Sequence, residues 1–251
     1  MPDVICEKKM HLKKISIDPY KFPVRDRYPF NLKVFQGTRE LEFHFPVTLF
    51  MGENGTGKST LLRAVSHKCG IHIWKYEKRR RCEFNPFEES LCEAVRVEWA
   101  EGPVDGSFFS SQTFQDFSQM LEEWAAASSG ILDYFGGKSL MTQSHGQSIM
   151  SYFKSRYEIK GLYLMDEPET ALSPKSQMEL LRVIKATAGS GNAQFVIATH
   201  SPIILSCPEA EIFSFDSVPV KKIRYEETEH HRIYRDFMID PKKFLQEEEP
   251  K

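Results

Sequence analysis

The sequence is poor in the features that mark secreted and membrane proteins. Only five of its 251 residues are cysteines, and no two of them stand in a C-x-x-C pair. A disulfide scaffold and the common zinc motifs are therefore excluded. No apolar run approaches the roughly 18–20 residues that cross a bilayer, and residues 1–14 are too polar for a signal peptide. We expect a cytoplasmic protein with reduced thiols.

An excess of positive charge is missing as well. Lysine and arginine number 33 against 35 aspartates and glutamates, which gives a formal net charge of -2. This balance excludes a globally basic nucleic-acid-binding protein, although it leaves room for a local basic patch. Residues 75–81 form such a patch, and we consider both a contact with nucleic acid and a solvated loop there.

What the sequence does contain is a regular alternation of strand-like and helical patterns. Residues 41–51 begin with alternating side chains and end in the apolar run 47–51, which is typical of a strand covered on both faces. Further strands are predicted at residues 12–17, 91–99, 161–165, 193–199, 211–215 and 220–225. Helical spacing occurs at residues 58–67, 108–127, 145–159 and 174–188, and in a charged tail after residue 225. Buried strands that alternate with helices predict an α/β fold with a parallel sheet.

A glycine-rich segment follows the apolar run 47–51. Residues 52–59 fit the pattern G-x-x-x-x-G-K-[ST] without a mismatch. In such a loop the glycines let backbone N–H groups wrap polyphosphate oxygens, and the next helix adds the positive end of its dipole. We expect Lys58 to reach the β- and γ-phosphates and Ser59 to ligate Mg²⁺. The candidate nucleotide-binding residues here are Gly52, Asn54, Gly55, Thr56, Gly57, Lys58, Ser59 and Thr60.

Two adjacent carboxylates end the apolar strand at residues 161–165. Beside a phosphate loop, at the carboxyl end of a parallel strand, Asp166 can hold Mg²⁺ directly or through water. Successive residues point in different directions, so Glu167 is free to orient or deprotonate an attacking water. The alternative is an acidic turn that only closes the strand, and the glycine-rich loop argues against it.

A histidine follows the second buried strand. His200 comes directly after residues 193–199 and is expected along the same rim of the sheet as Asp166. There it can hydrogen-bond the γ-phosphate or the attacking water. A structural histidine is the alternative.

These three elements, in this order, resemble the ABC-type ATPases, in particular the soluble branch with the SMC and DNA double-strand-break repair ATPases. The chain looks most like the compact, stand-alone bacterial predicted ATPases of that branch, from residue 12 to about residue 245. The resemblance implies one P-loop NTPase domain over residues 1–251, with a mainly parallel core sheet, an antiparallel β subdomain and a helical lobe at about residues 105–160. It also implies ATP and Mg²⁺ as cofactors. Residues 52–59 correspond to Walker A, Asp166 to Walker B, Glu167 to the catalytic glutamate and His200 to the switch histidine.

The resemblance also points to residues between the two Walker motifs. The family's signature segment Leu-Ser-Gly-Gly-Gln corresponds best to residues 143–147, in which Ser144, His145, Gly146 and Gln147 would contact the ATP of a partner subunit. His145 replaces a glycine. Gln112 is the candidate for the Q-loop glutamine that contacts Mg²⁺, with Gln115 as its competitor and an ordinary surface glutamine as the alternative. Residues 171–174 correspond to the D-loop.

A signature that acts in trans implies two chains closed head to tail around two ATP molecules, a C2 homodimer. We therefore expect an ATP-hydrolysing switch that works with DNA or an effector protein in repair or defence. The alternatives are the nucleotide-binding subunit of a membrane transporter and a non-hydrolysing ATP-dependent scaffold. Tyr28, Phe30 or Phe35 is expected to stack on adenine, and residues 226–231 are interpreted as a charged helix start rather than a metal cluster.

Overall fold

The structure is a computed structural model that describes residues 10–74, 85–127, 130–135, 137–156 and 159–245. The basic run at residues 75–81, considered above for nucleic-acid contact, lies outside the described residues. Among the helices that the structure describes, none is long and apolar enough to cross a membrane.

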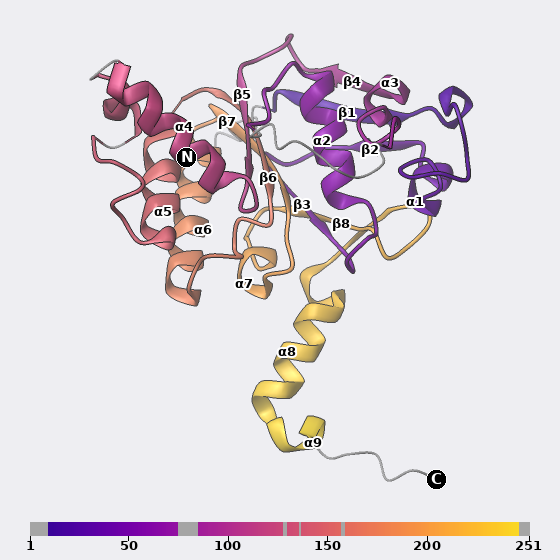
Figure 1. The fold of residues 1–251 in the computed structure, drawn as a ribbon. Helices are drawn as coiled ribbons and strands as arrows, with labels where there is room; N and C mark the ends of the chain where they lie inside the picture. The colour runs from indigo at the N-terminus through magenta and orange to yellow at the C-terminus, as the bar shows by residue number, and fades with distance from the viewer. Residues whose placement is uncertain (1–9, 75–84, 128–129, 136, 157–158, 246–251) are drawn as a thin grey trace, which may run out of the picture.

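A six-stranded sheet forms the centre of the molecule (Figure 1). Its order is β5 (Gly106–Ser110), β6 (Gly161–Asp166), β7 (Ala193–Ala198), β3 (Val47–Met51), β8 (Glu211–Ser214) and β9 (Lys221–Ile223). The first five strands are parallel, and β9 pairs antiparallel with β8. The predicted α/β fold with a mainly parallel core sheet is confirmed.

Helices cover both faces of this sheet, which is why its central strands are apolar throughout. All residues of β3, β6 and β7 are buried. On one face, Leu62 of α2 (Lys58–Lys68) belongs to the same apolar cluster as Leu164 and Val196. On the other face, Ile184 of α6 (Pro174–Gly189) shares a cluster with Ile197 and with residues of α5 (His145–Arg156).

A smaller antiparallel sheet lies beside the core, in the order β2 (Glu40–Glu42), β1 (Leu12–Ile17) and β4 (Val95–Trp99). Residues 41–51 are thus divided between two sheets, because the alternating part pairs with β1 and the apolar part enters the core as β3. The predicted strand at 91–99 is wrong over its first half. Residues 91–94 form the short helix α3 (Leu91–Ala94), which packs Leu91 and Ala94 into the core.

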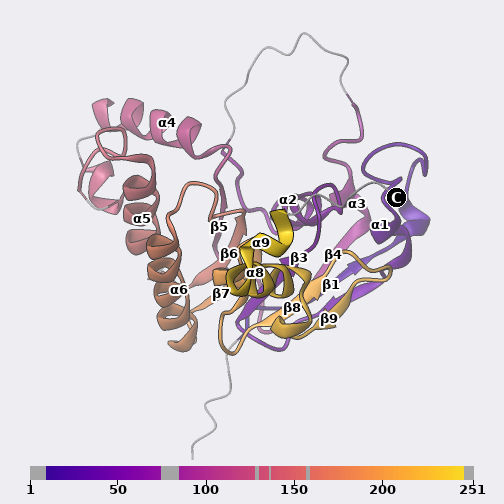
Figure 2. The same ribbon diagram turned by 90° about the horizontal axis from the view of Figure 1, so that it is seen from below.

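The helical lobe is smaller than expected. The helix predicted at 108–127 is wrong before residue 114, because Phe108 and Phe109 lie in β5, in register with Leu164 and Met165 of β6. The lobe consists of α4 (Phe114–Ala127), η2 (Ile131–Phe135) and α5. Figure 2 shows α4 and α5 on one side of the core sheet and the antiparallel sheet on the other.

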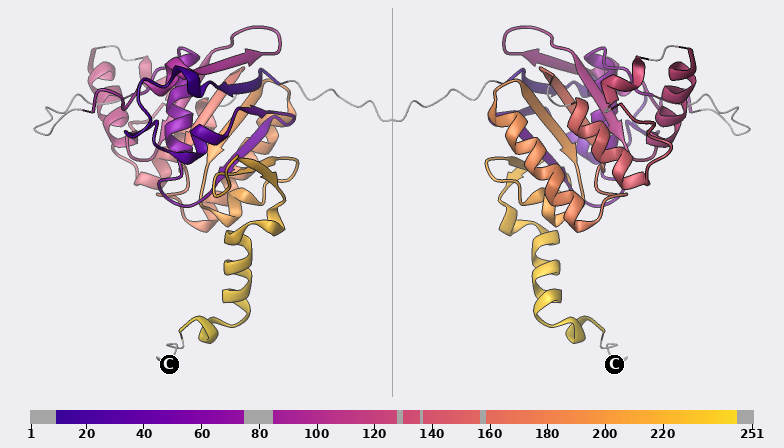
Figure 3. Two further views of the ribbon diagram at one scale, coloured as in Figure 1. Left: turned by 90° about the vertical axis from the view of Figure 1, so that its right-hand side faces the viewer. Right: turned by 90° about the vertical axis from the view of Figure 1, so that its left-hand side faces the viewer.

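Four further short helices belong to the described chain. They are η1 (Pro19–Lys21), α1 (Lys33–Gly37), α7 (Pro202–Leu205) and η3 (Tyr225–Glu227). The predicted charged helical tail is present as α8 (Glu229–Ile239) and α9 (Pro241–Leu245), and it projects away from the body (Figures 1 and 3). Thr228 caps α8 by accepting a 3.1 Å hydrogen bond from the backbone N–H of His231. Within the described residues there is no cluster of three metal-ligating side chains.

Candidate nucleotide site

The loop between β3 and α2 has a backbone that only glycine adopts easily. Gly52, Gly55 and Gly57 have φ angles of 146°, 81° and 103°, in the region where a side chain is strained. At Gly57 a Cβ atom would lie 2.8 Å from Cζ of the buried Phe35. The loop conformation therefore requires glycines at these places in the motif, and it turns the chain directly into the N-terminus of α2.

The side chain of Lys58 spans this loop. Its Nζ donates hydrogen bonds to the carbonyl oxygens of Gly52, at 2.6 Å, and Glu53, at 2.9 Å. Burial lowers the pKa of Lys58, because a charged ammonium is less stable away from water. Asn54, Gly55 and Thr56 form the outer part of the loop, in which the Thr56 hydroxyl donates to the Glu53 carbonyl oxygen at 2.8 Å.

Ser59 and Asp166 are in direct contact. The Ser59 hydroxyl donates a 2.6 Å hydrogen bond to Oδ1 of Asp166, while a guanidinium nitrogen of Arg63 lies 3.9 Å from Oδ2. Burial raises the pKa of Asp166, and the Ser59 hydrogen bond and Arg63 partly counter that effect. A hydroxyl and a carboxylate are the hard oxygen ligands that Mg²⁺ prefers. The chemistry of this pair therefore fits a magnesium site.

Glu167 and His200 face each other beside this pair. Nε2 of His200 lies 3.7 Å from Oε1 of Glu167 and is buried, with no hydrogen-bond partner within the part of the chain that the structure describes. Burial lowers the pKa of His200, and the nearby Lys58 lowers it further. The imidazole therefore stays neutral to a lower pH than it would in water.

The backbone of Glu167 is in the left-handed region, with φ at 49°, which is uncommon for a residue other than glycine. Two hydrogen bonds hold it there. Its N–H donates to the carbonyl oxygen of Ala198 at 2.9 Å, and its carbonyl oxygen accepts from the Ser111 hydroxyl at 2.5 Å. Such a conformation persists where the surroundings enforce it, and it turns the side chain out of the strand direction.

Glu169 is a residue of the site that the sequence analysis missed. Its Oε1 accepts hydrogen bonds from the backbone N–H groups of His200, at 2.6 Å, and Ser201, at 3.2 Å. Burial raises the pKa of Glu169. The carboxylate thus ties the turn after β7 to the turn after β6. The sequence signal that could have identified Glu169 is that it is the third acidic residue in the segment 166–169.

Gln112 and Gln115 remain alternatives for the Q-loop position. Ser110, the last residue of β5, is in register with Asp166, and Gln112 follows in the turn before α4. Gln115 lies in the first turn of α4, and both side chains are exposed. The turn contacts the site through Ser111, so its position suits a residue that links nucleotide to the helical lobe.

The candidate signature segment lies at the start of α5, in the helical lobe. Ser144, His145 and Gln147 are exposed, and Oε1 of Gln147 accepts a 3.2 Å hydrogen bond from the Ser144 N–H. At Gly146 a Cβ atom would meet the carbonyl oxygen of Ala171 at 3.1 Å. The segment therefore presents an exposed helix N-terminus beside the candidate D-loop.

The structure leaves one of the three aromatic candidates for stacking on adenine exposed. Phe30 and Phe35 are fully buried in the core, which removes them from consideration. The ring of Tyr28 is 40% exposed, and its hydroxyl lies 2.8 Å from Oγ1 of Thr60 in α2. Tyr28 therefore lies at the first turn of α2 and is exposed to a ligand there.

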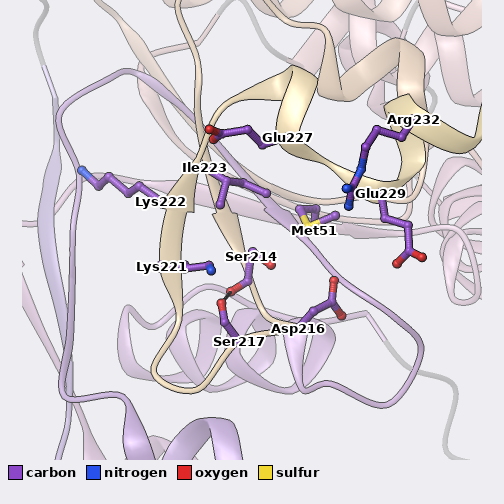
Figure 4. Close-up of a pocket in the computed structure, with 10 residues that line it drawn as sticks. All are labelled: Met51, Ser214, Asp216, Ser217, Lys221, Lys222, Ile223, Glu227, Glu229 and Arg232. Atoms are coloured by element: carbon purple, nitrogen blue, oxygen red, sulfur yellow. Dashed lines mark hydrogen bonds between the residues drawn. The ribbon is translucent and has the colours of Figure 1, made fainter. Parts of the chain in front are cut away.

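A pocket of about 440 Å³ adjoins the other side of the loop (Figure 4). Asp216 lines it and accepts a 2.7 Å hydrogen bond from the backbone N–H of Glu53, which fixes the loop to the end of β8. Glu229 and Arg232, from the first turn of α8, line the same pocket. Asp216 was not expected from the sequence, because no local pattern connects it to the loop.

Two family matches cover the segments just described. Residues 30–67, with the glycine-rich loop, match the family described as AAA domain. Residues 122–206, with the segments around Gly146, Asp166 and His200, match the family described as AAA domain, putative AbiEii toxin, Type IV TA system. No curated protein has a sequence that matches this chain.

Solved structures of similar fold include the ADP conformation and a nucleotide-free form of an ATP-binding cassette from an ABC transporter. Each is 14% identical with a TM-score of 0.51, over 93% of this chain and 97% of the other. The SMC head domain from Thermotoga maritima is 15% identical with a TM-score of 0.46, over 86% and 99%.

The fold, the glycine-rich loop and the two family matches make the chain similar to P-loop ATPases of the AAA/ABC class. Within that class its combination of a mostly parallel and an antiparallel sheet matches the heads of ABC ATPases.

Proposed function

We propose that this chain binds and hydrolyses ATP as a molecular switch, and that two copies close head to tail around two ATP molecules. The observation that carries the proposal is the 2.6 Å hydrogen bond between Ser59 and Asp166. It joins the phosphate loop to the acidic strand end, and Glu167 and His200 lie on the same rim. A phosphate cradle, a hard-cation site and a water-orienting acid are the parts that ATP hydrolysis requires.

The triphosphate binds to the loop 52–59 and the N-terminus of α2, through backbone N–H groups and the Lys58 ammonium. Lys58 now donates to two loop carbonyls, so binding exchanges at least one of these bonds for a phosphate oxygen. The exposed ring of Tyr28 stacks on adenine.

Ser59 and Asp166 hold Mg²⁺, and Gln112 is the candidate for a further contact. The positive charge offsets the burial that raises the pKa of Asp166. The chemistry that Mg²⁺ supplies when bound is neutralisation of charge on the β- and γ-phosphoryl oxygens.

Glu167 orients the attacking water and accepts its proton as the oxygen approaches the γ-phosphorus. The bond from the γ-phosphorus to the β-γ bridging oxygen breaks, and ADP and phosphate leave. His200 contacts the γ-phosphate or the water through its neutral imidazole, whose Nε2 has no hydrogen-bond partner among the described residues.

The exposed start of α5 completes the site of a second subunit. Ser144, Gly146 and the N–H groups of that helix end approach the γ-phosphate in trans, where a helix N-terminus favours an anion. ATP then holds the two subunits together, and hydrolysis releases them. His145, in place of the family's glycine, makes this contact bulkier than in its relatives.

The output of the switch is DNA or an effector protein. The family matched by residues 122–206 is described as a putative toxin of a Type IV TA system, which supports an effector in a defence system. The fold resembles transporter cassettes, but at 14% identity this supports the architecture alone.

The proposal is tested with Glu167→Gln protein and ATP plus Mg²⁺ on a sizing column. We expect a dimer, and a monomer when Lys58→Ala is added. Steady-state ATPase assays of the wild type, with and without duplex DNA, should then show activity per subunit that rises with protein concentration. A monomer under all conditions would refute the dimer, and activity unaffected by DNA would favour a protein effector.

A further inference from the structure

The helices α8 and α9 form an arm, residues 229–245, that projects from the body (Figures 1 and 3). No residue of α8, all of which the structure describes, is buried. The exposed large apolar side chains of the arm are Ile233, Tyr234, Phe237, Met238, Ile239 and Phe244. An isolated helix of this length is only marginally stable in water, so packing against a further surface would stabilise the arm.

The apolar side chains of the arm form a continuous stripe. Ile233 and Phe237 are four residues apart, as are Tyr234 and Met238, so both pairs lie along one side of α8. The ring centroids of Phe237 and Phe244 are 6.0 Å apart, which shows that α9 turns back and extends the stripe. The arm therefore has a defined apolar face rather than scattered apolar residues.

The base of the arm is continuous with the nucleotide site. The rings of His230 and His200 have centroids 5.5 Å apart, and His200 faces Glu167. On its other side the arm contributes Glu229 and Arg232 to the pocket beside the phosphate loop (Figure 4). The arm thus starts at the rim of the sheet that carries the candidate site.

The charges of the arm indicate what kind of surface covers it. Nucleic acids and anionic membranes select a strongly basic surface. Acidic and basic residues are instead interspersed here, namely Glu229, Asp236 and Asp240 among Arg232, Arg235, Lys242 and Lys243. Arg235 and Asp236 pair with each other at 2.8 Å. An apolar stripe on an arm whose acidic and basic residues nearly cancel fits a protein surface.

We propose that the arm of each subunit packs against the second copy of this chain when two subunits close around ATP. This inference rests on the dimer proposed above. Two-fold symmetry places two identical arms beside the shared interface, because each arm starts at the rim that the other subunit covers. The arms would hold the two subunits together, and we call this arrangement a clasp. The base of each arm, at His230, lies against His200, the residue proposed to contact the γ-phosphate.

The test compares two variants in the Glu167→Gln protein by analytical ultracentrifugation with ATP and Mg²⁺. Met238→Asp/Ile239→Asp changes two arm residues that are each 76% exposed, so the subunit should fold normally. Ile159→Asp is the matched control, since Ile159 is 49% exposed and lies before the amino end of β6, whereas the candidate site follows the carboxyl end of that strand. We expect the arm variant to weaken the dimer at least about 100-fold. The control and the affinity of single subunits for ATP should change by less than about 2-fold.

The outcomes distinguish failure of the arm proposal from failure of the dimer proposal. Equal dimerisation of the arm variant and the control overturns the clasp and leaves the dimer intact. A parent protein that binds ATP but stays monomeric overturns both. A photo-crosslinking residue at position 237 should join two copies of the chain in cells. Crosslinks only to a different protein would assign the arm to an effector and overturn the proposal.

Discussion

The carboxylate of Glu169 accepts a 2.6 Å hydrogen bond from the backbone N–H of His200, thirty-one residues further along the chain. This bond joins the turns that follow β6 and β7, and each of these turns carries a residue proposed to act on ATP. Glu169, a third residue, therefore helps to set the distance between Glu167 and His200.

Replacing Glu169 should lower the unfolding free energy of the protein. Glu169→Ala leaves the N–H of His200 without its partner in a buried place, which should cost about 1–3 kcal/mol of unfolding free energy. Glu169→Gln keeps one acceptor oxygen and should lose less. Urea unfolding of both variants checks this, and equal stability of Glu169→Ala and the wild type would show that the bond does not hold the turns together.

Glu167→Gln should bind ATP with unchanged affinity and hydrolyse it at least about 100-fold more slowly, the usual scale for loss of a general base. The substitution removes the proton acceptor and keeps the size of the side chain. Single-turnover hydrolysis and a fluorescent ATP analogue measure the two properties. Near-normal hydrolysis would mean that another group accepts the proton.

Lys58→Ala should lower ATP affinity by about 100-fold or more, because charge-assisted hydrogen bonds to the phosphates are lost. The substitution should change the melting temperature of the nucleotide-free protein only slightly. It should strongly reduce the rise in melting temperature that ATP causes. Thermal melts with and without ATP plus Mg²⁺ make this comparison. An undiminished shift in melting temperature would remove the phosphate loop from the proposal.

Tyr28→Ala should weaken ATP binding by about 5- to 100-fold, the range for loss of one base-stacking contact. Tyr28→Phe is the control, since it keeps the ring and loses only the hydroxyl that contacts Thr60. If both variants bind equally weakly, the hydroxyl matters rather than stacking. Calorimetric titration with ATP distinguishes these outcomes.

Stability should also depend on pH through His200. Burial lowers its pKa in the folded protein below the ordinary value of 6.5. As the pH falls through that value the unfolded chain takes up the proton first, so unfolding becomes easier. Between about pH 7.5 and about pH 5.5, the wild type should lose more unfolding free energy than His200→Asn. Equal losses would show that His200 ionises as readily in the folded state as in water.

The sequence alone determined the phosphate loop, the acidic strand end and the class of fold. These are local patterns in which residue type and spacing are themselves the physical requirement. Gly52, Gly55 and Gly57 have positive φ angles, and the apolar runs become strands that are covered on both faces. Local spacing was misleading at Phe108 and Phe109, where β5 pairs with β6 and overrides a helical pattern.

Only the tertiary structure decided how distant residues meet. It placed Ser59 on Asp166, His200 against both Glu167 and His230, and Asp216 on the phosphate loop. It also buried Phe30 and Phe35 while leaving Tyr28 exposed. These relationships depend on sheet order and on the packing of segments far apart in the chain, and no short stretch of sequence encodes either.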